Sequence, residues 1–336
     1  MLLCIRHHTH YRYERPVVRS HHLARLRPHD GAGQSVLAWR LTVRPTPAWR
    51  SDEVDPWHNR CTRFDFDQPH QTLDVWADAL VQTTVPAADA DDDAAWEQVR
   101  AALPFFPGAS DGGAPTLGPW VQASTYIPPA ALRSSALRQY AQACFAPGTG
   151  WLQGCRELAR RIHHDWTYTP GATRVDSSVL HVLRERRGVC QDFSHLMIAA
   201  LRSLGLPARY VSGYVLTQPP PGQARRVGTD ASHAWVAVPS RAGWYHLDPT
   251  HARWGLQRPS EAHVVLAHGR DYADAAPLGG VLHGGGRHAP VVAVTIAPAD
   301  EWAALGLHPP WPPSGLSAAS GADYNAAPSS FAPDQP

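Results

Sequence analysis

One segment of the chain reads Arg187-Gly188-Val189-Cys190-Gln191-Asp192-Phe193-Ser194-His195 and places a cysteine directly before a helix-forming run. Apolar residues then recur at helical spacing, at Phe193, Leu196, Met197, Ala200, Leu201 and Leu204. Gly205 ends the pattern. Free N–H groups and partial positive charge at a helix N-terminus stabilise a thiolate. The segment therefore predicts a helix that begins at or just after Cys190, and a thiol that can act as a nucleophile.

Two downstream segments offer the base and the acid that a nucleophilic thiol requires. Ser232-His233-Ala234-Trp235 contains a histidine, and His246-Leu247-Asp248-Pro249-Thr250 contains a carboxylate at the end of a predicted strand. We expect adjacent antiparallel strands to bring Asp248 beside His233, where it accepts the Nδ1 proton and fixes the imidazole tautomer. The order Cys190, His233, Asp248 predicts a catalytic triad for nucleophilic acyl transfer.

The strand around His233 also predicts a cleft. Period-two alternation turns Ala234, Val236 and Val238 toward the core, so that His233 and Trp235 share a semi-exposed face. The backbone N–H of Cys190 is a predicted oxyanion donor, because a helix N-terminus leaves it without an intrahelical acceptor. Further candidates for the oxyanion site or the cleft are Trp166, Tyr168, Gln191 and Trp235.

Two other histidines compete for the role of base. His195 follows Cys190 by five residues, which turns it about 140° around the helix and away from the thiol. We expect a structural role for it, with Asp192 as its partner. His246 shares a strand face with Asp248 and is a weaker alternative base.

Composition and charge argue against several classes of protein. The 336 residues carry a formal net charge of +1, which gives no whole-chain signal for nucleic acid or an anionic membrane. No apolar run approaches the roughly 18 residues of a spanning helix, so we expect no membrane partner and a cytoplasmic location. The five cysteines form no C-x-x-C pair, and the histidine groups lack H-E-x-x-H spacing. We therefore expect no disulfide framework, no metal and no other cofactor.

Four stretches differ in pattern along the chain. Residues 1–86 alternate in short β-rich runs, which predicts an antiparallel sandwich or half-barrel. Residues 87–150 combine an acidic linker with a helical segment, and residues 151–308 form the predicted catalytic core. Residues 309–336 are rich in proline, serine and alanine and are expected to be disordered. A helix that bears the cysteine, followed by strands that bear the histidine and the aspartate, predicts the α+β class.

Several ordered motifs resemble the bacterial transglutaminase-like protein family, within the papain-like cysteine acyl-transfer superfamily. They are His8–Tyr13, Gly188–Met197, Leu204–Tyr214, Asp230–Val236, Asp248–Thr250 and Gly269–Asp274. The resemblance implies a papain-like α+β core with a β-rich N-terminal domain, and a triad at Cys190, His233 and Asp248. It also implies that amide bonds of peptides or proteins are the substrate, attacked through a thioester acyl-enzyme.

The resemblance leaves the reaction open. Water as acyl acceptor gives a protease or amidase, and a primary amine gives a transglutaminase, with the same triad chemistry. The alternative is a catalytically inert peptide- or protein-binding module on the same fold. The Arg270-Asp271-Tyr272 loop either lines the cleft or serves packing. Two sites depart from the family pattern, Pro56–Asn59 in place of a Phe-Gly-Asn turn and His251 in place of asparagine. Neither is expected to touch the triad.

Overall fold

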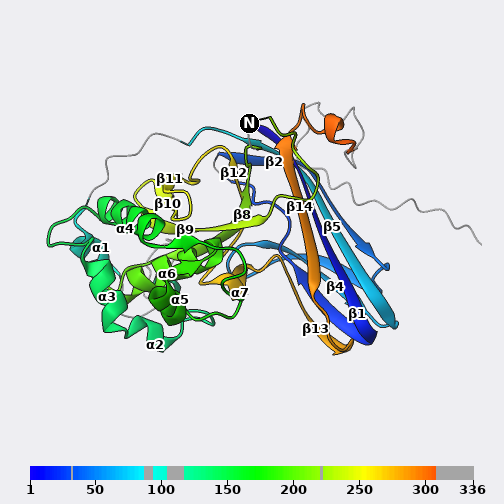
Figure 1. The fold of residues 1–336 in the computed structure, drawn as a ribbon, viewed down its shortest axis with the longest axis horizontal. Coiled ribbons are helices and arrows are strands. Elements are labelled where there is room, and N and C mark those ends of the chain that lie inside the picture. The colour runs from blue at the N-terminus through cyan, green and yellow to red at the C-terminus, as the bar shows by residue number, and fades with distance from the viewer. Residues whose placement is uncertain (32, 87–93, 104–116, 220–221, 308–336) are drawn as a thin grey trace, which may run out of the picture.

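The computed structural model describes residues 1–31, 33–86, 94–103, 117–219 and 222–307. The aspartates of the expected linker and the expected tail, residues 309–336, lie outside the described residues. The described chain forms two units that lie side by side, a sheet of long strands and a mixed unit of helices and strands (Figure 1).

The first unit is an antiparallel sheet built around the long strand β1. Seven strands of the described residues belong to it: β1 (Leu2–Ala24), β2 (Gln34–Arg44), β3 (Trp49–Val54), β4 (Arg60–Phe66), β5 (His70–Thr83), β13 (Leu278–Gly284) and β14 (Pro290–Pro298). The N-terminal half of β1 lies between β5 and β14, and its C-terminal half lies between β4 and β13. Alternate residues of β1, among them Leu3, Ile5 and His7, are buried as the period-two pattern predicts.

This sheet differs from the sequence-based picture in two respects. Strand β1 spans 23 residues and continues through Pro16, because register shifts around it absorb the missing N–H of the proline. Strands β13 and β14 fall within residues 151–308, the range expected for the catalytic core, yet both pair with β1. Alternation along a segment predicts a strand, whereas the partner of that strand depends on contacts with residues far away in the sequence.

The second unit packs helices on an antiparallel sheet with the strand order β11-β10-β9-β8-β12. Its strands are β8 (Arg209–Val215), β9 (Ser232–Ser240), β10 (Gly243–Asp248), β11 (Arg253–Leu256) and β12 (His263–Gly269), and the short strands β6 (Thr167–Tyr168) and β7 (Arg187–Gly188) pair separately. The described helices are α1 (Trp96–Ala101), α2 (Pro129–Leu132), α3 (Ser135–Gln142), α4 (Trp151–Asp165), α5 (Val179–Glu185), α6 (Cys190–Ser203) and α7 (Tyr272–Ala275), with the 3-10 turns η1 (Gly118–Val121) and η2 (Ala303–Leu305). The predicted α+β class is confirmed.

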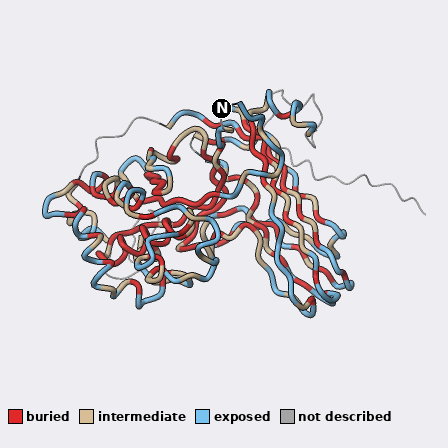
Figure 2. The backbone as a smooth tube through the Cα atoms, in the orientation of Figure 1, coloured by how far each residue is buried: buried red, intermediate tan, exposed pale blue. Residues whose placement is uncertain are grey.

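Helix α6 lies at the centre of the second unit, packed on β9 and against α3 and α5. Its predicted apolar face is buried, and so are its remaining residues from 192 to 203, because other elements surround the helix (Figure 2). Its buried polar groups have partners within the fold. Ser194 Oγ donates to the carbonyl of Cys190 at 2.8 Å, and the Arg202 guanidinium donates to the carbonyls of Ala208 and Arg270 at 2.9 and 2.7 Å. Helix α6 is therefore surrounded by packed elements, and its buried polar groups are hydrogen-bonded.

Side-chain amides of the first unit complete the edge strand of the second. Strand β12 ends the second sheet, and edge strands carry unpaired backbone groups. Gln34 exchanges two hydrogen bonds with the backbone of Val265, at 2.9 and 2.8 Å. Asn59 does the same with the backbone of His268, at 2.8 and 2.7 Å. These contacts join the two units and leave β12 protected.

Candidate active site

Cys190 is the first residue of α6, as the sequence predicts within one residue. The Asp192 carboxylate accepts the backbone N–H of Val189 at 2.8 Å and the hydroxyl of Thr173 at 2.6 Å, which closes the first turn. A Cβ atom on Gly188 would lie 2.7 Å from Oδ2 of Asp192. Glycine at position 188 therefore lets the chain approach the capping carboxylate and enter the helix at the cysteine.

His233 lies near the start of β9 and is buried. Its Nε2 atom is 2.8 Å from Oδ2 of Asp248, at the end of β10, and Cys190 lies close enough to the ring to influence its pKa. The three residues chosen from the sequence thus come together in space. The expected ring orientation was wrong, since Nε2 rather than Nδ1 faces Asp248. Strand β9 lies beside β10, and the contact with Asp248 leaves Nδ1 on the other side of the ring.

The Asp248 carboxylate is fully buried and holds several groups besides His233. Its Oδ1 atom accepts the backbone N–H of Thr250 at 2.8 Å, which fixes the turn after β10. Its Oδ2 atom lies 2.7 Å from Nδ1 of His251 and 3.2 Å from Nε2 of His263. Three imidazole rings therefore surround a single carboxylate oxygen.

Burial and charge have opposite effects on the pKa values of His233 and Asp248. Burial alone lowers the pKa of His233, but the charge and hydrogen bond of Asp248, with the hydrogen bond of Cys190, outweigh it and raise that pKa to about 10. Burial likewise opposes ionisation of Asp248, but the charge of His233 and the imidazole hydrogen bonds hold its pKa well below the usual range. A protonated imidazole between a carboxylate and a thiolate is the charge arrangement of Cys–His nucleophiles.

The four further candidates occupy different surroundings. Three have their donor groups engaged elsewhere: the Trp166 indole donates to Val182 O at 2.9 Å, the Gln191 amide to Val175 O at 3.0 Å, and the Trp235 indole to His246 Nδ1 at 2.8 Å. Trp235 is also fully buried, so the expected semi-exposed face of β9 was wrong. A small cluster with Val211 and Val265 covers that face.

Tyr168 is the candidate that lies open beside the thiol. Its side chain is half-exposed and its ring contacts Phe193 edge-on. Burial, together with the charge of Cys190, raises the pKa of Tyr168. Tyr210 on β8 also lies within electrostatic reach of Cys190, with burial as the main cause of its raised pKa. Sequence reasoning did not select Tyr210, although it stands inside one of the motifs that carry the family resemblance.

The competing histidines have other partners. His195 accepts the backbone N–H of Tyr272 at 3.1 Å and stacks on Tyr126, so Asp192 is not its partner. Burial lowers the pKa of His195 to about 4. His246 accepts the Trp235 indole, and burial holds its pKa well below the usual range. Both rings are neutral and hydrogen-bonded within the fold.

Sequence reasoning missed two members of the cluster. His251 was noticed only as a departure from asparagine, and the expectation that it stays clear of the triad was wrong, because its ring contacts Asp248. Its position three residues after Asp248 was the available signal. His263 comes from β12, and its contact with Asp248 depends on how the strands assemble, so no local pattern could have found it.

The Arg270-Asp271-Tyr272 loop makes several packing contacts. The buried guanidinium of Arg202 donates to the carbonyl of Arg270, and the Asp271 carboxylate accepts the backbone N–H of Tyr126 at 2.6 Å. The Arg270 guanidinium pairs with Asp274 at 2.8 Å. These bonds tie the loop to α6 and to the segment before α2.

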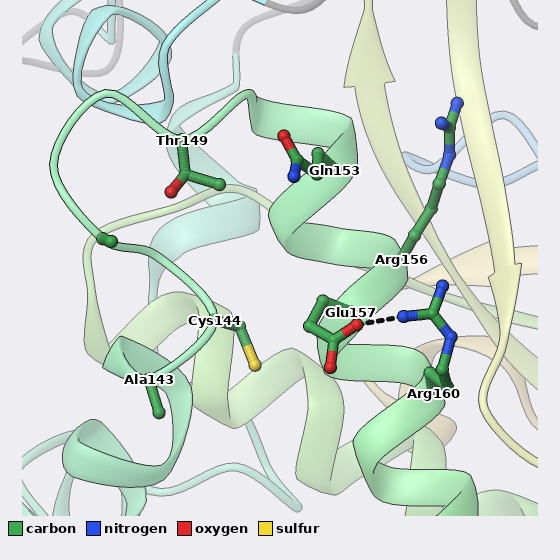
Figure 3. Close-up of a pocket in the computed structure, with 8 residues that line it drawn as sticks. Ala143, Cys144, Thr149, Gln153, Arg156, Glu157 and Arg160 are labelled. Carbon is green, nitrogen blue, oxygen red and sulfur yellow. Dashed lines mark hydrogen bonds and ion pairs between the residues drawn. The ribbon is translucent and has the colours of Figure 1, made fainter.

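A separate pocket of about 450 Å³ lies beside α4 (Figure 3). Cys144, Gln153, Arg156 and Glu157 are among its lining residues, and Glu157 pairs with Arg160. No triad residue lines it. Within the described residues, every helix is too short or too polar to cross a bilayer.

The sequence matches two family profiles: the bacterial transglutaminase-like N-terminal region over residues 3–82, and the transglutaminase-like superfamily over residues 138–249. An uncharacterised protein of Mycobacterium tuberculosis is 36% identical over 312 residues, which cover 88% of this chain and 92% of that protein. The chain belongs to the bacterial transglutaminase-like family. The predicted family is therefore confirmed.

Other transglutaminase-like relatives match over different extents. A protein-glutamine gamma-glutamyltransferase of Pseudomonas aeruginosa is 31% identical over 126 residues, which cover 36% of this chain and 19% of that protein. The crystal structure of a candidate cysteine protease from Cytophaga hutchinsonii superposes with a TM-score of 0.64 at 23% identity, covering 89% of this chain and 91% of that chain. The chain therefore shares its fold with that structure over both units.

Proposed function

We propose that this transglutaminase-like protein is a thiol enzyme that acts on amide bonds of peptides or proteins through Cys190, His233 and Asp248. The observation that carries the proposal is the 2.8 Å contact between His233 Nε2 and the buried Asp248 carboxylate, with Cys190 at the start of α6 within electrostatic reach of the same ring. Three positions support the proposal: the thiol begins a helix, the imidazole contacts the carboxylate, and the carboxylate is buried.

The chemistry follows from these contacts. The raised pKa of His233 favours transfer of the thiol proton to its Nδ1 atom, and the resulting Cys190 thiolate attacks the amide carbonyl carbon. The N–H of Cys190, in the first turn of α6, donates to the developing oxyanion. The His233 imidazolium then gives its proton to the departing amine, which leaves an acyl thioester on Cys190. Water releases an acid from the thioester, and a primary amine releases a new amide.

The acceptor decides between hydrolysis and amine transfer. The 30 basic residues of the chain are all arginine, so no lysine side chain of the protein competes as an amine donor. Any amine incorporated in an assay comes from the peptide or from an added amine. A peptide mixture incubated with and without a labelled primary amine therefore separates cleavage, deamidation and amine transfer by mass shift alone.

The deciding test is this incubation with wild-type protein, Cys190→Ala and Cys4→Ala. Cys4 is a matched control, because its thiol is buried in the first unit and burial raises its pKa to about 11. We expect turnover by wild type and Cys4→Ala and none by Cys190→Ala. If Cys190 also reacts slowly with iodoacetamide near neutral pH, and no mass shift occurs, the protein is the inert binding module and the enzyme proposal fails.

The cytoplasmic location expected from the sequence is part of the same proposal. All five cysteines lie within the described residues and are thiols rather than disulfides, which suits a reducing compartment. Cell fractionation with an antibody against the chain tests it. Recovery in a secreted or periplasmic fraction would contradict this part of the proposal and leave the triad chemistry untouched.

A further inference from the structure

The carboxylate of Asp248 gathers more donors than the orientation of His233 requires. Its Oδ2 atom lies 2.8 Å from His233 Nε2, 2.7 Å from His251 Nδ1 and 3.2 Å from His263 Nε2. A carboxylate oxygen offers about two lone pairs to donors, so three imidazole N–H groups exceed its capacity. Imidazole nitrogens that converge with a carboxylate oxygen are, however, a donor set that divalent zinc binds.

The geometry of this cluster suits an ion. His233 Nε2, Asp248 Oδ2 and His251 Nδ1 all lie within 4.8 Å of one another. Ligand atoms of tetrahedral zinc, each about 2.0 to 2.2 Å from the metal, are separated by about 3.3 to 3.6 Å, so small side-chain shifts are sufficient. The His263 ring is held by a 2.8 Å contact between its Nδ1 and Ser260 Oγ, a supporting hydrogen bond of the kind that orients metal-binding rings.

The cluster also has an entrance and a favourable charge. The His251 side chain is 45% exposed, whereas the Asp248 side chain is fully buried, so an ion would enter past His251. The buried carboxylate of Asp248 is the anionic centre of the group. A cation that replaces the proton on His233 Nε2 therefore meets a buried carboxylate in a partly preformed donor set.

A second group with metal-binding atoms lies on the outer face of the first sheet. Its charged surroundings differ from those of the cluster at Asp248. His8 and His10 lie 2.7 and 2.8 Å from Asp74 Oδ1, and all three are half-buried. Arg44 is directly opposite Asp74 in the register of β2 and β5. A fixed cation beside the carboxylate disfavours a divalent ion. The charges therefore favour the cluster at Asp248.

We propose that His233 Nε2, Asp248 Oδ2 and His251 Nδ1 form a binding site for a zinc-class divalent cation that reversibly inhibits the enzyme. The inhibition rests on the function proposed above, whereas the binding site does not. A cation on Nε2 takes that nitrogen away from Asp248, so the remaining ring proton stands on Nδ1. A ring protonated on Nδ1 donates toward Cys190 and no longer accepts the thiol proton. The protons displaced by the ion pass to solvent.

The test is calorimetric titration of the full chain with zinc chloride, for wild type and for Cys190→Ala, His251→Asn and His10→Asn. We expect a site with the same affinity in wild type, Cys190→Ala and His10→Asn, and an affinity at least about 10-fold weaker in His251→Asn. Cobalt(II) in the same site should give visible d–d absorption without the thiolate charge-transfer band, because Cys190 is not a ligand.

Several results would overturn the proposal. Unchanged affinity in His251→Asn shows that His251 is not a ligand. Loss of zinc binding in Cys190→Ala, or a thiolate charge-transfer band with cobalt, would show that the thiol binds the metal. Loss of zinc binding in His10→Asn would show that the metal binds on the first sheet.

The inhibitory effect of zinc is measured as the rate of Cys190 alkylation by iodoacetamide with and without zinc. We expect zinc to slow it at least about 10-fold in wild type and not in His251→Asn. Zinc binding that does not slow alkylation disproves the inhibitory role. If the protein has no enzymatic activity but still binds zinc, the proposed enzyme function fails and the metal site stands.

Discussion

His233 turns its Nε2 atom toward Oδ2 of Asp248, 2.8 Å away, which leaves Nδ1 on the side of the ring away from the carboxylate. The carboxylate therefore determines which ring nitrogen carries a permanent proton and which exchanges one with the thiol. Because Asp248 is fully buried and held by the Thr250 backbone, the orientation of the ring is built into the turn after β10. The predictions below test this arrangement and the fold that supports it.

Replacing Asp248 by asparagine should abolish most turnover while leaving the fold in place. The amide is nearly isosteric, but it neither stabilises an imidazolium nor fixes the Nε2–H tautomer, so we expect a loss of roughly 10³- to 10⁴-fold in kcat. Turnover of the peptide mixture, followed by mass spectrometry, measures it. Asp65→Asn is the control, since Asp65 pairs with the exposed His21 on the first sheet. Equal rates for the two variants would remove Asp248 from the mechanism.

The contribution of His233 to stability should disappear in alkaline solution. Its pKa in the folded protein is raised to about 10 from an ordinary value of 6.5. A raised folded pKa contributes stability that is fully present below about pH 6.5 and is lost as the pH rises through about 10. The lowered pKa of Asp248 makes its contribution vanish only in acid, below its ordinary value of 3.8.

Urea unfolding of wild type and His233→Gln at about pH 6, 8 and 10.5 measures this dependence. We expect the difference in free energy of unfolding to be largest at the lowest of these pH values and to shrink toward the highest. His21→Gln, which removes an exposed histidine that pairs with Asp65, is the control for loss of an imidazole at the surface. A constant difference for His233→Gln would show that the ring is not protonated in the folded state.

Gln34 should stabilise the protein far more than an exposed glutamine of the same sheet. Its buried amide pairs with both backbone groups of Val265 and with the carbonyl of His29 at 2.7 Å. Gln34→Ala leaves these groups unpaired, which we expect to cost about 2 to 4 kcal/mol of unfolding free energy. Gln82→Ala, at an exposed position on β5, should cost less than about 0.5 kcal/mol. Similar midpoints in urea for the two variants would mean that the units are not joined through β12.

Gly188 should tolerate no side chain. A Cβ atom there would stand 2.7 Å from Oδ2 and 2.8 Å from Cβ of Asp192, the residue that caps α6. Gly188→Ala should therefore displace the cap, cost about 1 to 3 kcal/mol and slow alkylation of Cys190. Gly279→Ala is the matched control, because its Cβ would meet open space. Alkylation of Gly188→Ala at the wild-type rate would show that the cap does not position the thiol.

Local patterns predicted the elements that carry the candidate site. The apolar spacing after Cys190 gave the length of α6, and the predicted helix start differs from the observed one by at most one residue. Alternation in β9 correctly turned Ala234, Val236 and Val238 toward the core. Helix and strand periodicities depend on neighbours along the chain, so a single sequence contains the information for them.

Features that depend on contacts between residues far apart in the chain could not be predicted from local patterns. The pairing of β13 and β14 with β1, the burial of Trp235 and the approach of His263 to Asp248 all join residues far apart in the chain. The ring orientation of His233 belongs to the same class, since it depends on how β9 and β10 lie beside α6. Residue types and their spacing do not specify which distant residues come into contact.

The amino-acid sequence by itself determined the chemical inventory: a thiol at a helix start, a histidine and an aspartate on later strands, and an α+β order of elements. The tertiary structure alone decided which nitrogen of His233 faces Asp248 and that His251 and His263 share its carboxylate oxygen. The physical reason is one of range. Helix and strand formation follow from local backbone and side-chain preferences, whereas the donors around a buried carboxylate are set by the packing of strands that meet only in the folded protein.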